Sequence, residues 1–226
     1  MRTVIRNELS TQDLTARARI REAAIECFAA DGFDAPFRTI AAHAGVSPAL
    51  ITHHFGSKHA LRAECDAEVL RQYRVLKTDG VSRPSAHLLE ALSAPGMSAT
   101  VLVYMLRVIL AGGTSAREFI DHLIDDMRQV MADGVASGLL RPSRNEEARL
   151  RYLTYQTMGA LVVQFVTTPD ASPEEFVAWL RTGQHDTILP TLELLTEGLL
   201  ADRSMLDDYL AYVAETTNPA TRRSRQ

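Results

Sequence analysis

The chain has 226 residues, of which 46% are hydrophobic and 23% charged, a composition typical of a globular protein and not of a disordered or fibrous one. Its 21 glycines and prolines are about 9% of the residues, below the average of ~12%, and favour helices. Two cysteines, Cys27 and Cys65, exclude a disulfide framework. Without an apolar leader or a window of ~18 apolar residues, we expect a cytoplasmic protein with no membrane partner.

Charge is distributed unevenly along the chain. The formal net charge is −4. Residues 1–75 carry a net charge of +1 and four of the seven histidines, whereas residues 77–216 carry −8. The last ten residues contain three arginines and no acid. This asymmetry is consistent with a protein that presents its N-terminal end to a polyanion.

Four helices are expected before residue 80. They span residues 14–30, 37–44, 47–54 and 58 to about 80. Gly45 ends the second helix, Ser47 can cap the third, and Pro48 suits its first position. In the fourth helix a buried stripe is expected from apolar residues four apart, namely Leu61, Cys65, Val69 and Tyr73.

The stretch 80–85, rich in glycine, serine and proline, is the best candidate for a domain boundary. Seven further helices are expected after it, at 85–93, 98–111, 116–137, 146–167, 173–182, 187–201 and 205–216. Convincing strand alternation and internal repeats are both missing from the sequence. The fold class is therefore all-α, and residues 217–226 are expected to form a disordered basic tail.

A helix-turn-helix is indicated by the run Thr39-Ile40-Ala41-Ala42-His43-Ala44-Gly45-Val46-Ser47. Two short helices would approach closely through their alanines, and Gly45 would take a backbone conformation with positive φ. An ordinary αα-hairpin can contain the same turn, so the pattern alone leaves both interpretations open.

The residues around this turn resemble the N-terminal domain of TetR-type transcriptional regulators. The likeness covers about fifty residues, from Ile20 to Leu61, and includes Gly32-Phe33, Ala44-Gly45-Val46-Ser47 and Ser57-Lys58-His59-Ala60-Leu61. It implies a three-helix DNA-binding domain, expected at residues 10–78, followed by a helical effector-binding and dimerisation domain at residues 79–216. The rest of the chain matches the family only in helical layout and length.

The resemblance also implies which residues contact DNA. Residues 47–54 would form the recognition helix, and Lys58 would meet a phosphate at a helix N-terminus. The expected contacts are Arg38, Thr39, Ser47, Pro48, Ala49, Thr52, His53 and Lys58. Thr52 and Pro36 depart from the tyrosine and the serine or threonine common in the family, so we hypothesise that Arg38 replaces a lost phosphate contact.

The neighbouring histidines allow two interpretations. His53, His54 and His59 suggest a metal site, but adjacent residues face different sides of a helix, and no cysteine or carboxylate has finger-type spacing. We therefore expect no metal and no cofactor. His53 is interpreted as a DNA-facing polar group and His54 as a packing residue beside Phe55.

The segment 98–111 is apolar on nearly all sides and should be a central, buried helix. Arg107 is its only charge, and a buried arginine needs a partner. Asp121, Asp125 or Asp126 is the expected partner. A pocket group for an anionic ligand and a surface position are the alternatives.

Two late helices carry apolar faces that suit a partner helix, and the family resemblance implies that they pair with their symmetry mates. The expected dimer contacts are Tyr152, Tyr155, Gly159, Val162, Val166, Ile188, Leu192, Leu195 and Leu199. A two-fold homodimer suits a palindromic operator of double-stranded DNA, with half-sites ~34–36 Å apart. A monomer with an unusually large core is the alternative.

Soft and aromatic residues of the second domain could line an apolar cavity, although they serve equally well as plain core. The candidates, with Arg107, are Met97, Tyr104, Met105, Met127, Met131, Tyr155, Met158 and Trp179. The leading interpretation is a homodimeric repressor released from DNA by a small, mostly apolar effector. A DNA-binding regulator without an effector stays open. An enzyme is disfavoured because the sequence contains no catalytic or nucleotide-binding motif.

Overall fold

The computed structural model describes residues 2–82, 98–168, 171–182 and 184–217, and it divides into two compact units, residues 1–181 and 182–226. The regular elements of these ranges are all α-helices, so the all-α prediction is confirmed. The expected helix at 85–93, Met97 and residues 218–226 lie outside the described residues. Within the described ranges no helix combines the length and apolarity needed to cross a membrane.

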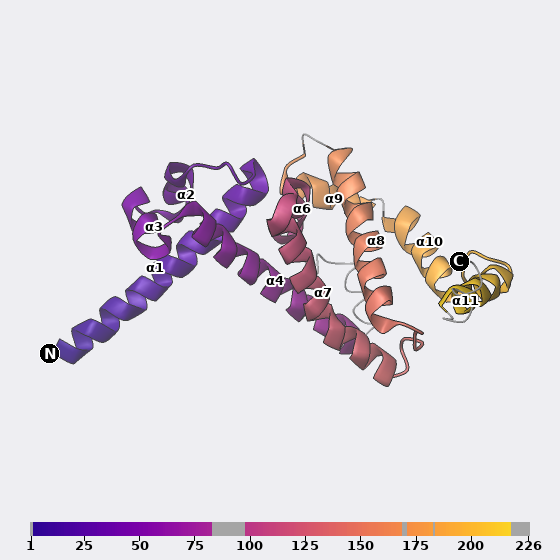
Figure 1. The fold of residues 1–226 in the computed structure, drawn as a ribbon. Helices are drawn as coiled ribbons and strands as arrows, with labels where there is room; N and C mark the ends of the chain where they lie inside the picture. Colours follow the sequence, from indigo (N-terminus) through magenta and orange to yellow (C-terminus); the bar gives the residue numbers. More distant parts are fainter. Residues whose placement is uncertain (1, 83–97, 169–170, 183, 218–226) are drawn as a thin grey trace, which may run out of the picture. The chain divides into compact units, whose positions relative to one another are not determined.

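The helices of the two units follow one another along the chain (Figure 1). The first unit contains α1 (Arg2–Asp31), α2 (Phe37–Ala44), α3 (Pro48–Phe55), α4 (Lys58–Ser82), α6 (Ala99–Ala111), α7 (Gly113–Ala136), α8 (Glu146–Val166) and α9 (Pro173–Thr182). The second contains α10 (Gln184–Thr196) and α11 (Ser204–Thr217).

Several helix ends differ from the prediction, including the starts of α7 at Gly113 rather than 116 and of α10 at Gln184 rather than 187. The first helix begins at Arg2 rather than at residue 14, because residues 2–13 contain no glycine or proline to interrupt it. The fourth continues through Gly80 to Ser82. The helix expected to reach residue 201 ends at Thr196, since Gly198 adopts a φ of +85° and turns the chain.

The turn between α2 and α3 is built by local stereochemistry, as expected. Gly45 adopts the left-handed conformation with a φ of +64°, and the Val46 N–H donates to the carbonyl of Ala41 over 2.9 Å. The Ser47 hydroxyl accepts from the Leu50 N–H at 3.3 Å, and Pro48 occupies the first helical position. Helix α2 packs against α1 and α3, and α3 also packs against α1 and α4. Their buried apolar residues are Ile40, Ala41, Ala44, Ile51 and Phe55.

One continuous core runs from α1 to α9. Helix α6 lies at its centre, as its apolar sequence predicted, and seven of its residues are buried. It packs against α1 on one side and against α4, α7 and α8 on the others. The DNA-binding candidate region therefore shares its core with the helices that follow it.

Candidate nucleic-acid interface

Helix α3 has one buried face and one exposed face. Ile51 is completely buried and Phe55 is 6% exposed, so these two side chains anchor the helix. Pro48, Ala49, Thr52 and His53 are all exposed. The free face of α3 is therefore formed by four of the residues that the sequence singled out.

The other four candidate contacts border this face. Arg38, in the first turn of α2, and Ser47 are exposed, while Thr39 and Lys58 are half-buried. Lys58 opens α4, where the Ser57 hydroxyl accepts from the Ala60 N–H at 3.1 Å. All eight candidates thus come from α2, α3 and the first residue of α4, including the cap between α2 and α3.

The two adjacent histidines of α3 have different surroundings. His53 is exposed, whereas His54 is half-buried, with its ring centroid 6.2 Å from that of Phe55. His54 therefore packs on the helix-turn-helix core, as predicted. In the part of the chain that the structure describes, no group of three His, Cys, Asp or Glu residues is placed to hold a metal ion.

Two arginines of α1 cap the C-terminal ends of the short helices. Arg19 donates from Nη2 to the carbonyl of Ala44 at the end of α2, over 2.7 Å. Arg17 donates from Nη1 to the carbonyl of His54 in the last turn of α3, also over 2.7 Å, and forms an ion pair with Glu64 of α4. A guanidinium suits a helix C-terminus, where unpaired carbonyls carry partial negative charge.

Arg107 of α6 caps α1 in the same way, and the prediction that an aspartate pairs with it is wrong. Its Nε donates to the carbonyl of Ala29 over 2.5 Å and its Nη2 to that of Ala30 over 2.6 Å. The three aspartates pair elsewhere. Asp126 contacts Arg74 at 3.1 Å, Asp125 contacts Arg128 at 3.0 Å, and Asp121 contacts Arg151 at 3.2 Å.

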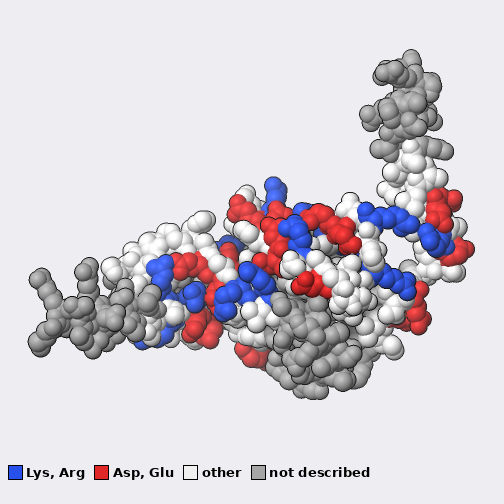
Figure 2. Space-filling view, turned by 90° about the horizontal axis from the view of Figure 1, so that it is seen from below, with Lys and Arg blue, Asp and Glu red and all other residues white. Residues whose placement is uncertain are grey.

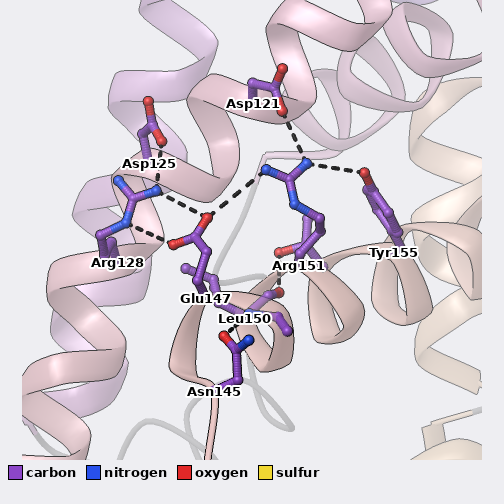
Figure 3. A network of polar contacts seen from close by, with 10 residues as sticks. Asp121, Asp125, Arg128, Asn145, Glu147, Leu150, Arg151 and Tyr155 are labelled. Atoms are coloured by element: carbon purple, nitrogen blue, oxygen red, sulfur yellow. Dashed lines mark hydrogen bonds and ion pairs between the residues drawn. The ribbon is translucent and has the colours of Figure 1, made fainter. Parts of the chain in front are cut away.

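The pairs of Asp121 and Asp125 belong to a surface network that joins α7 to α8 (Figure 3). Glu147 lies between the two arginines and accepts from Arg128 Nε at 3.0 Å, while Arg151 also donates to the Tyr155 hydroxyl at 3.2 Å. In Figure 2, acidic and basic side chains lie next to one another over the face shown, without a large area of one sign.

An aromatic cluster lies where α1 meets α6. Phe33, in the loop after α1, has its ring centroid 5.4 Å from those of both Phe28 and Tyr104. The Tyr104 hydroxyl donates to Asp66 of α4 over 2.7 Å, and burial raises the pKa values of both groups. Arg62 of α4 stacks on Phe33, its guanidinium carbon 3.6 Å from the ring centroid. Apart from Gly32-Phe33 in the family resemblance, no sequence signal pointed to this cluster.

The expected ligand-contact residues are scattered. Tyr104, Met105, Met127 and Met158 are buried in the core, Met131 is half-buried, and Tyr155 and Trp179 are exposed. Arg107 caps α1, as described above. A cavity of about 360 Å³ lies instead between α4 and α7, and its lining, which includes Arg62, Asp66 and Phe119, contains none of these residues.

The expected dimer face of α8 is largely exposed. Tyr152 is 66% exposed, and Tyr155, Gly159 and Val166 are exposed as well. Val162 is half-buried and packs on the core, whereas the neighbouring Val163, which the sequence analysis did not select, is 61% exposed. In the second unit Leu192, Leu195 and Leu199 are exposed, and the side chain of Ile188 lies outside the described residues.

Known proteins resemble the chain along most of its length. Residues 20–65 match the family model "Bacterial regulatory proteins, tetR family", and residues 97–201 match "Tetracyclin repressor-like, C-terminal domain". The HTH-type transcriptional regulatory protein RaaS of Mycobacterium tuberculosis is 39% identical over 204 residues, which cover 90% of this chain and 95% of that protein.

Two solved structures from Rhodococcus share the fold. One, a putative TetR-family transcriptional regulator, has a TM-score of 0.53 and 17% identity, covering 76% of this chain and 97% of its own. The other, a putative transcriptional regulator of strain RHA1, has a TM-score of 0.52 and 19% identity, covering 75% and 95%. The matches identify a regulator rather than an enzyme. With its helix-turn-helix for DNA binding, the chain belongs to the TetR family of bacterial transcriptional regulators.

Proposed function

We propose that the protein is a homodimeric repressor that binds a palindromic operator and is released from it by a small, mostly apolar molecule. The observation that carries this proposal is the exposed face of α3, formed by Pro48, Ala49, Thr52 and His53 over the buried anchors Ile51 and Phe55. A short helix that is anchored through its buried face and exposes its other face to solvent suits insertion into the major groove.

The neighbouring cations would fix the register of α3 on the duplex. Lys58 lies at the N-terminus of α4, where its charge and the helix dipole both favour a phosphate. Exposed Arg38, in the first turn of α2, would supply the phosphate contact that Pro36 and Thr52 lack. Base discrimination would then come from Thr52 and His53, because these polar groups lie on the free face of α3.

The exposed face of α8 supports a homodimer. Tyr152, Tyr155, Val163 and Val166 are each at least half exposed, and Gly159 leaves room for a close helix. Such a row of large apolar side chains is unfavourable in water and favours burial against a second copy. The leucines 192, 195 and 199 of the second unit are also exposed, and we assign them a separate contact with the second copy.

Release by an effector would act through α4. This helix begins with Lys58 at the DNA side and continues to Ser82, and it packs against α7. A molecule that shifts α4 would therefore change the spacing of the two recognition helices of a dimer. The coupling free energy of such a switch is typically 1–3 kcal/mol.

Selection of DNA from a randomised duplex library tests the proposal. The purified protein should enrich a two-fold symmetric motif, and the triple variant Ser47→Ala, His53→Ala, Lys58→Ala should not. Arg144→Ala is the matched control, because it also removes one positive charge but lies between α7 and α8. Equal enrichment by the triple variant would show that α3 does not recognise the DNA sequence.

Sedimentation equilibrium tests the dimer separately. Val163→Glu with Tyr152→Glu should shift the protein toward monomer, since it places charge in the proposed interface. Leu139→Glu changes an exposed leucine of the α7–α8 connection and should leave the mass unchanged. A mass that stays dimeric in the double variant would contradict the α8 interface.

A further inference from the structure

The cavity of about 360 Å³ between α4 and α7 is lined by both apolar and charged residues. Its apolar lining residues are Ala63, Ala67, Leu70 and Phe119. The volume is within the range of small-molecule sites, at its lower end. A compact ligand with one apolar part therefore suits the cavity better than a long or fully polar one.

Two of the three acids that line the cavity are already engaged. Asp126 pairs with Arg74 at 3.1 Å, and Asp66 accepts a hydrogen bond from the Tyr104 hydroxyl at 2.7 Å. The third acid, Glu118, is exposed. Arg62, a half-buried residue, is therefore the charged group in the lining whose hydrogen-bonding capacity calls for an explanation. The exposed His59 and His122 also line the cavity.

One edge of the Arg62 guanidinium is unsatisfied. Its Nε and Nη2 atoms are buried and donate no hydrogen bond within the described part of the chain. In other arginines of the protein, the Nε and Nη2 atoms donate together to a carboxylate. Arg71 holds Glu68 in this way at 3.0 and 2.6 Å, and Arg128 holds Glu147 at 3.0 and 3.2 Å. Buried donors without partners are costly, and an oxyanion satisfies this fork of N–H groups well.

We propose that the α4–α7 cavity binds a small organic anion, a carboxylate or phosphate monoester on an apolar body, and that Arg62 recognises the anionic group. While the guanidinium stacks on Phe33, with its carbon 3.6 Å from the ring centroid, the Nε and Nη2 atoms of Arg62 are inaccessible to solvent. The anion must therefore draw Arg62 away from Phe33. Because Phe33 lies in the loop between α1 and α2, binding would loosen a contact between α4 and the DNA-binding helices.

Calorimetric titration of the full-length protein tests the binding step. The probes are 4-phenylbutyrate and 4-phenylbutyl phosphate, with 4-phenylbutan-1-ol as the neutral match and 4-phenylbutylamine as the cationic one. At least one anion should bind about tenfold more tightly than the alcohol, and the amine should bind no better than the alcohol. Equal affinities for anion and alcohol, or no saturable binding of either anion, would overturn the proposal.

Three variants locate the site. Arg62→Gln should weaken anion binding about tenfold and leave alcohol binding unchanged, which would also show that the cavity is still formed. Ala67→Trp should abolish binding of every probe, because Ala67 is exposed on the cavity wall and the larger ring fills it. Arg128→Gln, at an ion pair outside the cavity lining, should change nothing. Unchanged anion affinity in Arg62→Gln would assign recognition to another group.

The consequence for DNA rests on the proposed repressor function, so it is measured separately with the selected operator. The anion should release the wild-type protein from DNA and should fail to release Arg62→Gln at a concentration that saturates that variant. If no operator is selected but binding still depends on Arg62, the site stands and the repressor proposal fails. If the anion binds wild type without weakening DNA binding, the coupling through Phe33 is wrong.

Discussion

The DNA-binding helices and the α7–α8 pair are held together in opposite ways. Around α2 and α3 the links are buried apolar side chains and guanidinium groups that donate to main-chain carbonyls. Between α7 and α8, the polar links are ion pairs among side chains that are about half exposed to water. Water and salt weaken the second kind of link but do not reach the buried apolar side chains that carry the first. The first region should therefore be rigid and sensitive to substitution. Substitutions in the surface network between α7 and α8 should change the stability little.

The largest expected effect follows from removing the anchor of α3. Ile51→Ala deletes a completely buried side chain between α3 and the helices behind it, and should lower the free energy of unfolding by about 2–5 kcal/mol. DNA binding should fall with it. Urea unfolding followed by circular dichroism measures the change. A loss below ~1 kcal/mol would show that the region repacks easily and is not rigid.

The Arg107 cap should have the next largest effect. Arg107→Gln removes the charged donor from the carbonyls of Ala29 and Ala30, and should cost about 1.5–3 kcal/mol. Arg107→Lys keeps the charge at the end of α1 but not the fork, and should recover part of the loss. Equal stability of both variants and wild type in urea would mean that the cap contributes nothing.

Glu68 of α4 makes the stability of the protein depend on pH in the acid range. A hydrogen bond from Arg71, with Gln72 and Arg21 nearby, lowers its pKa from an ordinary 4.5 to about 2. The stabilisation is therefore complete above pH 4.5 and is lost as the pH falls toward 2. Glu68→Gln should lower stability by about 1–2 kcal/mol at pH 7 and flatten the stability curve over that acid range. Parallel curves for variant and wild type would contradict this assignment.

The smallest effect is expected in the surface network. Arg128→Ala breaks the contacts with Asp125 and Glu147, but all three groups are exposed, so the melting temperature should not change measurably. Melting in low and high salt, with Arg107→Gln in parallel, checks the contrast between the two regions. A clear destabilisation by Arg128→Ala that disappears in high salt would show that exposed pairs do hold α7 to α8.

What could be predicted from the sequence was mostly local. Gly45 and Ser47 act within a few residues, so their conformations follow from residue type and spacing. The Arg107 prediction was wrong because spacing suggested an aspartate, whereas the real acceptors are main-chain carbonyls 78 and 77 positions away. Every residue has a carbonyl, so no pattern marks such an acceptor. The stacking of Arg62 on Phe33 was missed for the same reason, since only the folded chain brings the two together.

The use of carbonyl acceptors by Arg107 matters for experiments that exchange the DNA-binding region between relatives of this protein. Because Arg107 donates to main-chain carbonyls, this contact between α6 and α1 does not depend on which side chains occupy positions 29 and 30. What it does require is the position at which α1 ends, because one added or deleted residue would rotate the last carbonyls by about 100° around the helix axis. A transplanted DNA-binding region should therefore keep its contact with α6 when the length of α1 up to Asp31 is preserved, even where its sequence has diverged.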